Sequence, residues 1–266
     1  MGSRIADLYR NWEAAAEARF RRLQSNERKL NQHFIRIYGI EGDLSPAVPE
    51  REVSVRRADL QREIRSLLSF AVGCVFGRYS VDTPGLCYTG GAWNTSLYRT
   101  VLPTEQSVLP VSSASGNTES LTDRVTDFIR KVYGSDTLEE NLSFIANVLG
   151  GEGTSYDVLS QYFSRSFFAD HCRIYHKRPI YWVFRSGRLR AFSAVAYYHR
   201  WNRETVPTVL GFCQDAAKQQ HNRCEPELAA YAEKLRMIAE SGIIPDPECS
   251  IPENYKRFAE ILEPIP

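Results

Sequence analysis

The chain has 266 residues, of which 43% are hydrophobic and 24% are charged, and its formal net charge is +1. This composition is ordinary for a soluble globular protein with a sizeable core, in one large domain or two modest ones. The near-zero net charge excludes a polycation, so any affinity for nucleic acid must come from local basic patches.

A long helix is predicted at the start of the chain. Apolar residues such as Ile5, Leu8 and Phe34 recur at steps of three and four between residues 4 and 38. An isolated helix is only marginally stable, so we expect this one to lie against a partner surface. Glycines and prolines between residues 39 and 49 break it.

Further helices are predicted along the rest of the chain. Residues 58–78 begin charged and become wholly apolar, so their second half should be buried. Residues 79–117 are rich in loop-forming residues. Late helices are predicted at 226–242 and 254–262. Three helices between these regions are predicted from pairs typical of capping boxes: Ser120 with Asp123, Asp136 with Glu139, and Thr154 with Asp157.

Two strands are predicted at 179–185 and 189–198, joined by a hairpin turn at Ser186-Gly187. The predicted fold is therefore α+β and dominated by helices, with a long N-terminal helix and a small antiparallel β-hairpin or sheet. We expect three parts: a connector helix with its linker (1–50), a main α+β domain (51–215) and a C-terminal helical segment (216–266).

The sequence gives little support to a metal site. The six cysteines are scattered and none forms a CxxC pair, which disfavours a zinc ribbon. His171, Cys172 and His176 lie close together, but no glutamate follows His171 and no second ligand pair is near. We expect core or surface histidines, reduced thiols and no metal. No apolar run reaches about 18 residues, so no membrane span is expected, and no signal peptide is recognised.

A basic and aromatic stretch runs from Arg165 to Arg203. It contains nine Lys or Arg residues, ten aromatic residues and one acid, Asp170. Alternate residues of a strand face opposite sides, so the hairpin is expected to bury its aromatic face and to present a basic outward face to DNA phosphates. In the alternative interpretation the stretch has only a structural role: the aromatic residues fill the core and the arginines are solvated without contacting DNA. The candidate DNA-binding residues are Arg173, Lys177, Arg178, Arg185, Arg188, Arg190, Arg200 and Arg203.

No catalytic residue is predicted in this chain. The glycine-rich stretch 149–154 lacks a preceding strand and a following lysine, so it is interpreted as a helix-to-helix turn. Asp246, Glu253 and Lys256 have the residue types of a nuclease site, but their spacing does not place them on one strand.

Several long blocks resemble the C-terminal part of one enzyme family, the large adenine-specific DNA methyltransferases of BREX and phage-growth-limitation defence systems. That family is similar in build to single-chain restriction-modification enzymes. The likeness extends from about residue 10 to residue 210. The blocks are NERKLNQHFIRIYGI (26–40), the segment from VSVRRADL to CYTGG (53–91), TLEENLSFIANVLGGEGT (137–154) and the segment from FFADHC to YYHRW (167–201).

The resemblance implies a piece of a bacterial phage-defence enzyme that depends on S-adenosylmethionine. In the family, the methyltransferase core lies N-terminal to this region and carries the cofactor-binding glycine motif and an Asn-Pro-Pro-Tyr motif. Neither occurs here, so this chain is expected to hold no catalytic or cofactor-binding residue and to be inactive alone. The opening Met-Gly-Ser resembles a cloning remnant, which also indicates a piece of a longer protein. A long charged helical segment that usually follows in the family is shortened here at 211–224.

Three functional hypotheses follow. The first is a non-catalytic, cytoplasmic region that engages double-stranded DNA or recognises the target, with base readout from loops 86–118. The second is a protein-interaction scaffold that docks the methyltransferase core of the parent chain or other defence-system subunits without touching DNA. The third, a stand-alone enzyme, is supported by no motif. A salt-dependent affinity for duplex DNA separates the first hypothesis from the second.

Overall fold

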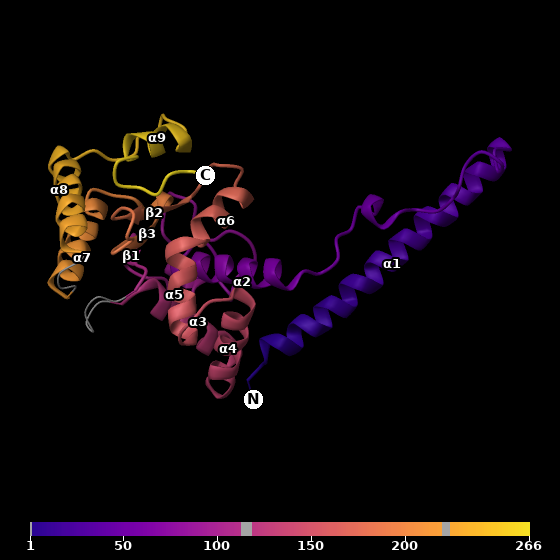
Figure 1. The fold of residues 1–266 in the computed structure, drawn as a ribbon, viewed down its shortest axis with the longest axis horizontal. Coiled ribbons are helices and arrows are strands. Elements are labelled where there is room, and N and C mark those ends of the chain that lie inside the picture. The colour runs from indigo at the N-terminus through magenta and orange to yellow at the C-terminus, as the bar shows by residue number, and fades with distance from the viewer. Residues whose placement is uncertain (1, 113–118, 220–223) are drawn as a thin grey trace. The chain divides into compact units, whose positions relative to one another are not determined.

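The computed structural model describes residues 2–112, 119–219 and 224–266 (Figure 1). The chain forms two compact units, residues 3–63 and residues 64–266 with Gly2. The strands of the described residues are β1 (Val108–Pro110), β2 (Tyr181–Arg185) and β3 (Ser193–Tyr197). The helices are α1 (Ile5–Tyr38), α2 (Leu60–Val75), α3 (Leu121–Tyr133), α4 (Leu138–Leu149), α5 (Ser155–Arg165), α6 (Phe167–Ile174), α7 (Thr205–Gln219), α8 (Glu225–Ser241) and α9 (Ile251–Arg257). The predicted helix-dominated α+β class is confirmed, whereas the predicted boundaries after residues 50 and 215 stay predictions.

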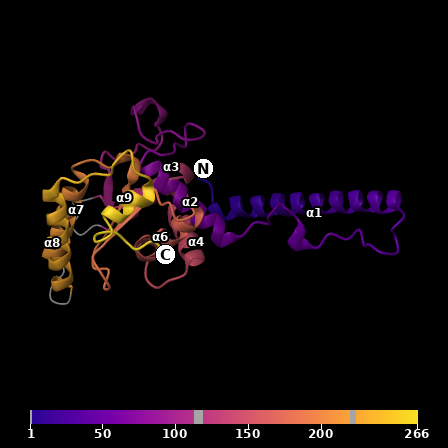
Figure 2. The same cartoon turned by 90° about the horizontal axis from the view of Figure 1, so that it is seen from above.

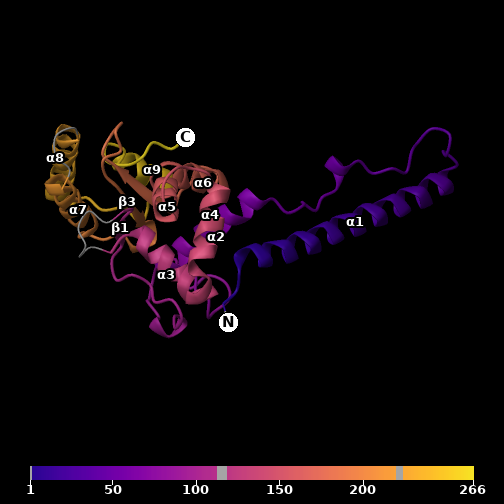
Figure 3. The ribbon, with the colours of Figure 1, turned by 60° about the horizontal axis from the view of Figure 1, so that its bottom comes forward.

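The first unit consists of α1 and the segment that runs back along it (Figures 2 and 3). The helix is continuous for 34 residues, as predicted, and ends where Gly39 adopts the left-handed conformation with φ 66°. The Gln24 side chain donates a hydrogen bond of 2.8 Å to the carbonyl oxygen of Val48 in the returning segment. Phe20 and Val53 are buried in this unit. The returning segment thus covers part of the apolar stripe of α1.

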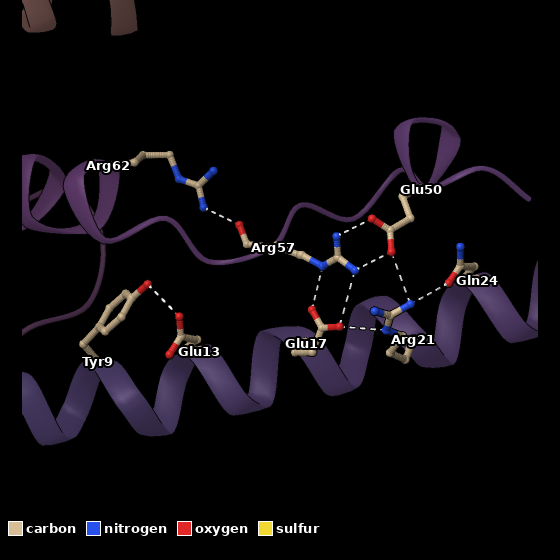
Figure 4. A network of polar contacts seen from close by, with 8 residues as sticks. All are labelled: Tyr9, Glu13, Glu17, Arg21, Gln24, Glu50, Arg57 and Arg62. Atoms are coloured by element: carbon tan, nitrogen blue, oxygen red, sulfur yellow. Dashed lines mark hydrogen bonds and ion pairs between the residues drawn. The ribbon is translucent and has the colours of Figure 1, made fainter.

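A network of ion pairs fixes the returning segment on α1 (Figure 4). The Arg57 guanidinium lies 2.7 Å from carboxylate oxygens of both Glu17 and Glu50, and 4.1 Å from the centre of the Phe20 ring. Arg21 binds the same two carboxylates. The hydrogen bond from Arg57 lowers the pKa of Glu50 to about 2. Single exposed ion pairs contribute little, but this network combines paired hydrogen bonds with stacking on an aromatic ring.

Replacing Arg57 with lysine keeps the charge and removes both the planar fork and the stacking. We expect faster amide hydrogen exchange across residues 44–58 in the Arg57→Lys variant, and unchanged exchange in residues 64–266. The control is Arg22→Lys, which changes an exposed residue of the same helix. Equal exchange rates in Arg57→Lys and the unsubstituted chain would show that the network does not hold the segment.

The second unit is built around a three-stranded antiparallel sheet in the order β1-β3-β2. Tyr181 pairs with Tyr197 and Arg185 with Ser193, so β2 and β3 form the predicted hairpin. The strand β1 was missed because three residues are too short to show an alternating pattern. The predicted two-residue turn at Ser186-Gly187 is wrong, since residues 186–192 connect the strands.

The connection between β2 and β3 is closed by contacts that the sequence alone does not reveal. The Ser186 amide donates to the carbonyl oxygen of Phe192 at 3.1 Å, and the Ser186 hydroxyl accepts from the Phe192 amide at 3.0 Å. The Glu227 carboxylate of α8 accepts hydrogen bonds from the Ser186 hydroxyl and the Leu189 amide, both at 2.8 Å. A residue about 40 positions later in the chain therefore holds this connection.

Both faces of the β2–β3 hairpin are buried, so the predicted basic outward face of the hairpin is wrong. On one face, the rings of Tyr181 and Phe76 lie 6.2 Å apart between their centroids. On the other, the Trp182 ring lies 5.1 Å from Tyr255 and 5.8 Å from Phe258. In Figure 1 the strands lie between the α7–α8 pair and the group that contains α2 and α6. A sheet covered on both faces reads as a continuous apolar run and leaves no strand position for a solvated cation.

The helix starts were predicted with mixed success. Capping boxes at Ser120 with Asp123 and at Thr154 with Asp157 are confirmed. The third pair is wrong, because α4 begins after Thr137, whose side chain makes no capping hydrogen bond. The helix α7, which packs along α8, includes the first part of the segment 211–224 that was expected to be shortened. Among the described helices, none is long and apolar enough to cross a membrane.

Candidate nucleic-acid interface

His171 of α6 is hydrogen-bonded to the backbone where the loop leads into β2. Its Nε2 accepts hydrogen bonds from the backbone amides of Ile180, at 2.9 Å, and Tyr181, at 3.1 Å. The side chain is buried, and its ring centroid lies 6.0 Å from Phe167 and 4.4 Å from Tyr175. A ring nitrogen that accepts two amide hydrogen bonds carries no proton, so the imidazole is neutral and protonated at Nδ1. His171 is therefore the core histidine that was predicted.

Burial, followed by the nearby charge of Arg78, lowers the pKa of His171 to about 3. The neutral form is favoured because an imidazolium would have to be desolvated and would also lose both accepted hydrogen bonds. In the part of the chain that the structure describes, no three His, Cys, Asp or Glu side chains come together as a possible metal site. His176, the other histidine of the stretch, is exposed.

The lowered pKa of His171 makes stability depend on pH. Below about pH 6.5 the unfolded chain binds a proton that the folded protein excludes down to about pH 3. The contribution of neutral His171 to the free energy of unfolding is fully present above pH 6.5. As the pH falls below this value, the contribution is lost by up to about 1.4 kcal/mol per pH unit. Urea unfolding at pH 7, 6 and 5 measures this slope.

The slope should be smaller in His171→Gln, with a remainder from His199, whose pKa burial also lowers. His33→Gln, on the exposed side of α1, serves as the control and should keep the original slope. Identical slopes in His171→Gln and the unsubstituted chain would contradict the neutral-imidazole assignment.

The loop after α6 is a fixed turn that projects basic side chains. His176 and Lys177 both adopt the left-handed conformation, with φ of 49° and 61°. The Lys177 amide donates to the carbonyl oxygen of Cys172 at 2.8 Å, and the Arg178 amide to that of Tyr175 at 2.9 Å. Such backbone conformations are costly for residues with a side chain, and they persist where surrounding contacts impose them. The loop backbone therefore has a defined shape at Lys177 and Arg178, whose side chains are exposed.

Three of the eight predicted residues are engaged inside the protein. Arg185 and Arg190 both bind the Glu263 carboxylate, at 2.9 and 3.0 Å. Arg200 donates to the carbonyl oxygens of Thr104 and Glu105 at 2.6 and 2.8 Å. Burial lowers the pKa of Arg200. These arginines hold the C-terminal segment and the chain before β1 in place.

The other five predicted residues are exposed, but the structure does not bring all of them together. In an antiparallel hairpin, β2 starts beside the end of β3, and its five residues span about 17 Å. Arg188 lies on the connection at the far end of this strand, and Arg203 lies on the turn before α7. The remaining three exposed residues follow one another on α6 and its loop: Arg173, Lys177 and Arg178.

Two further cations lie beside α6 and were not selected from the sequence. The buried Asp170 carboxylate binds Arg65 of α2 at 3.1 Å and Arg173 at 3.2 Å, and it accepts a hydrogen bond from Tyr162. Arg65 and Asp170 are 105 positions apart, so no local pattern could pair them. Arg165, at the end of α5, is exposed and makes no ion pair among the described residues. We call the five cations of this region the α6 basic group: Arg65, Arg165, Arg173, Lys177 and Arg178.

The residues that suggested other chemistry have structural roles. The glycine-rich stretch 149–154 joins α4 to α5, as predicted, so the element directly before it is a helix and not a strand. It therefore does not fit the strand, glycine-loop and helix arrangement that holds a nucleoside cofactor. The Glu253 carboxylate accepts hydrogen bonds from the amide and hydroxyl of Ser250 and caps α9. The Asp246 amide donates to the side chain of Asn254.

These features define a helix-rich α+β unit with a local basic surface, and no family model matches the chain. Two curated proteins are similar to it. An adenine-specific methyltransferase named PglX, from Lacticaseibacillus casei (strain Zhang), is 42% identical over 209 residues, which cover 77% of this chain and 17% of that protein. An adenine-specific methyltransferase named BrxX, from Escherichia coli O9:H4 (strain HS), is 30% identical over 246 residues, which cover 76% of this chain and 20% of that protein.

The chain thus contains a region homologous to PglX- and BrxX-type adenine-specific methyltransferases, which confirms the resemblance found in the sequence blocks. It spans about a fifth of the length of these curated relatives.

Proposed function

We propose that this chain is a non-catalytic, DNA-engaging region of an adenine-specific DNA methyltransferase. In this proposal the α6 basic group contacts phosphates of a DNA duplex, while S-adenosylmethionine and the methyl-transfer residues belong to another part of the parent protein. The observation that carries the proposal is the fixed loop after α6, which presents Lys177 and Arg178 beside Arg173. The names of the two relatives support the enzyme class.

The loop is suited to phosphate contact for two physical reasons. Lys177 and Arg178 form no ion pair among the described residues, whereas the buried Asp170 carboxylate binds Arg65, Arg173 and Tyr162. The loop backbone is held by the His171 hydrogen bonds, so less conformational freedom is lost on binding. Contacts of this kind position a protein on DNA without reading its sequence. Base readout would come from the loop region 86–118, of which 113–118 lie outside the described residues.

The test is fluorescence anisotropy with a labelled mixed-sequence duplex at salt concentrations between about 50 and 200 mM. The unsubstituted chain should bind, and its affinity should fall steeply with salt. In a variant with Arg173→Gln, Lys177→Gln and Arg178→Gln, we expect weaker binding. The plot of log affinity against log salt concentration should become less steep by about 0.9 for each phosphate contact that is lost.

The matched control removes three exposed cations from α8 and α9 through Lys234→Gln, Arg236→Gln and Lys256→Gln. It has the same change in net charge, so a local surface and a general charge effect are separated. Equal losses of affinity in the two variants would reject the α6 loop as the contact surface.

A second candidate function is supported by α1. The helix exposes several large apolar side chains at helical spacing, with exposed fractions of 44% to 71%: Leu8, Trp12, Leu30, Phe34, Ile37 and Tyr38. An extended apolar surface of this kind is typical of a docking site. Because the chain spans about a fifth of its relatives, the partner would be the remainder of the parent methyltransferase. An absence of DNA binding even at low salt would favour this scaffold role over the first proposal.

A further inference from the structure

A small polar pocket lies between the ends of α4 and α5, next to the start of α6. Its volume is about 130 Å³. Its lining includes two arginines, one glutamine and two residues with a hydroxyl group, and the full set is Arg65, Leu149, Gly150, Val158, Gln161, Tyr162, Arg165 and Ser166. All of these residues belong to the second unit.

The pocket has hydrogen-bond donors that the protein itself does not use. The Nε of Arg65 is buried and has no partner among the described residues, although Nη1 of the same side chain binds Asp170. Arg165 makes no described ion pair or hydrogen bond with its side chain. The hydroxyl of Ser166 makes no capping hydrogen bond at the start of α6. The side chains of Arg165 and Ser166 are therefore the donors available to an oxygen-rich ligand in the pocket.

The charge of the pocket favours an anion. One carboxylate, that of Asp170, binds both Arg65 and Arg173, so it offsets only part of their positive charge. Arg165 adds a further positive charge that this carboxylate does not bind. Guanidinium groups match the geometry of phosphate oxygens, to which they donate in pairs.

The pocket has room for a small ligand. Its volume of about 130 Å³ exceeds the roughly 10–15 Å³ of such space that one water molecule needs. One tetrahedral anion fits within this volume.

We propose that this pocket binds one phosphate group between Arg65 and Arg165. If the phosphate belongs to DNA, the inference rests on the proposed function. The bound group is then a backbone phosphate next to those contacted by Arg173 and the α6 loop. The chemistry is the same for inorganic phosphate, which therefore serves as an independent probe.

The substitution to make is Arg165→Gln. Arg165 is exposed and holds no other residue in place, whereas Arg65 also binds Asp170 and its loss would disturb α6. Lys234→Gln on α8 is the control, because it removes one exposed charge far along the chain from the pocket. Circular dichroism checks that both variants keep the helical content of the unsubstituted chain.

The first measurement is thermal unfolding in inorganic phosphate against sodium chloride at equal ionic strength. The unsubstituted chain and Lys234→Gln should melt at a higher temperature in phosphate, and Arg165→Gln should lose most of this shift. The second measurement is the salt dependence of duplex binding. Arg165→Gln should reduce the steepness of the plot of log affinity against log salt concentration by about 0.9.

The two measurements separate the two proposals. A phosphate shift that is absent, or that is unchanged in Arg165→Gln, overturns the pocket even if the chain binds DNA. A phosphate shift that depends on Arg165, in a chain that does not bind DNA at low salt, supports the pocket and rejects the DNA-engaging role. If Arg165→Gln loses the phosphate-induced rise in melting temperature and also binds the duplex with a smaller salt dependence, the result supports a DNA phosphate as the occupant.

Discussion

The second unit depends on one polar contact inside its core, the pair of hydrogen bonds that Nε2 of His171 accepts from the amides of Ile180 and Tyr181. This contact joins α6 to the first residue of β2 and thereby fixes where the sheet begins. It satisfies two backbone donors that would otherwise be buried without an acceptor. The same contact closes the loop that carries Lys177 and Arg178, so the stability of the core and the shape of the basic surface have a common origin.

Burial of the sheet on both faces determines where the cations can lie. Tyr181 and Trp182 occupy opposite faces of β2, and each face is covered by aromatic side chains from other elements. Cations are therefore confined to strand ends and connections. Some are then neutralised locally, because Glu263 binds Arg185 and Arg190 at the end of the strand. Other cations lie on and beside α6, where one buried acid, Asp170, is shared between Arg65 and Arg173.

A chain with a net charge of +1 can thus still expose a local group of cations. What matters for association is the local surplus of one sign of charge, while acids elsewhere balance the total. Asp170 has a positioning role in this surface, since it draws Arg65 of α2 toward Arg173 of α6. In the proposed function, a region of this kind would add affinity for DNA to a larger enzyme.

The sequence by itself determined the helix-dominated class, the long α1, two capping boxes, the two longer strands and the family, because these depend on local periodicity or on long matching blocks. Tertiary structure decided which arginines are free: Arg185 and Arg190 are bound by an acid more than 70 positions later, and Arg65 joins the basic group through Asp170 at a separation of 105. Ion pairs and burial between distant segments leave no periodic trace in the chain, so only the folded structure could assign them.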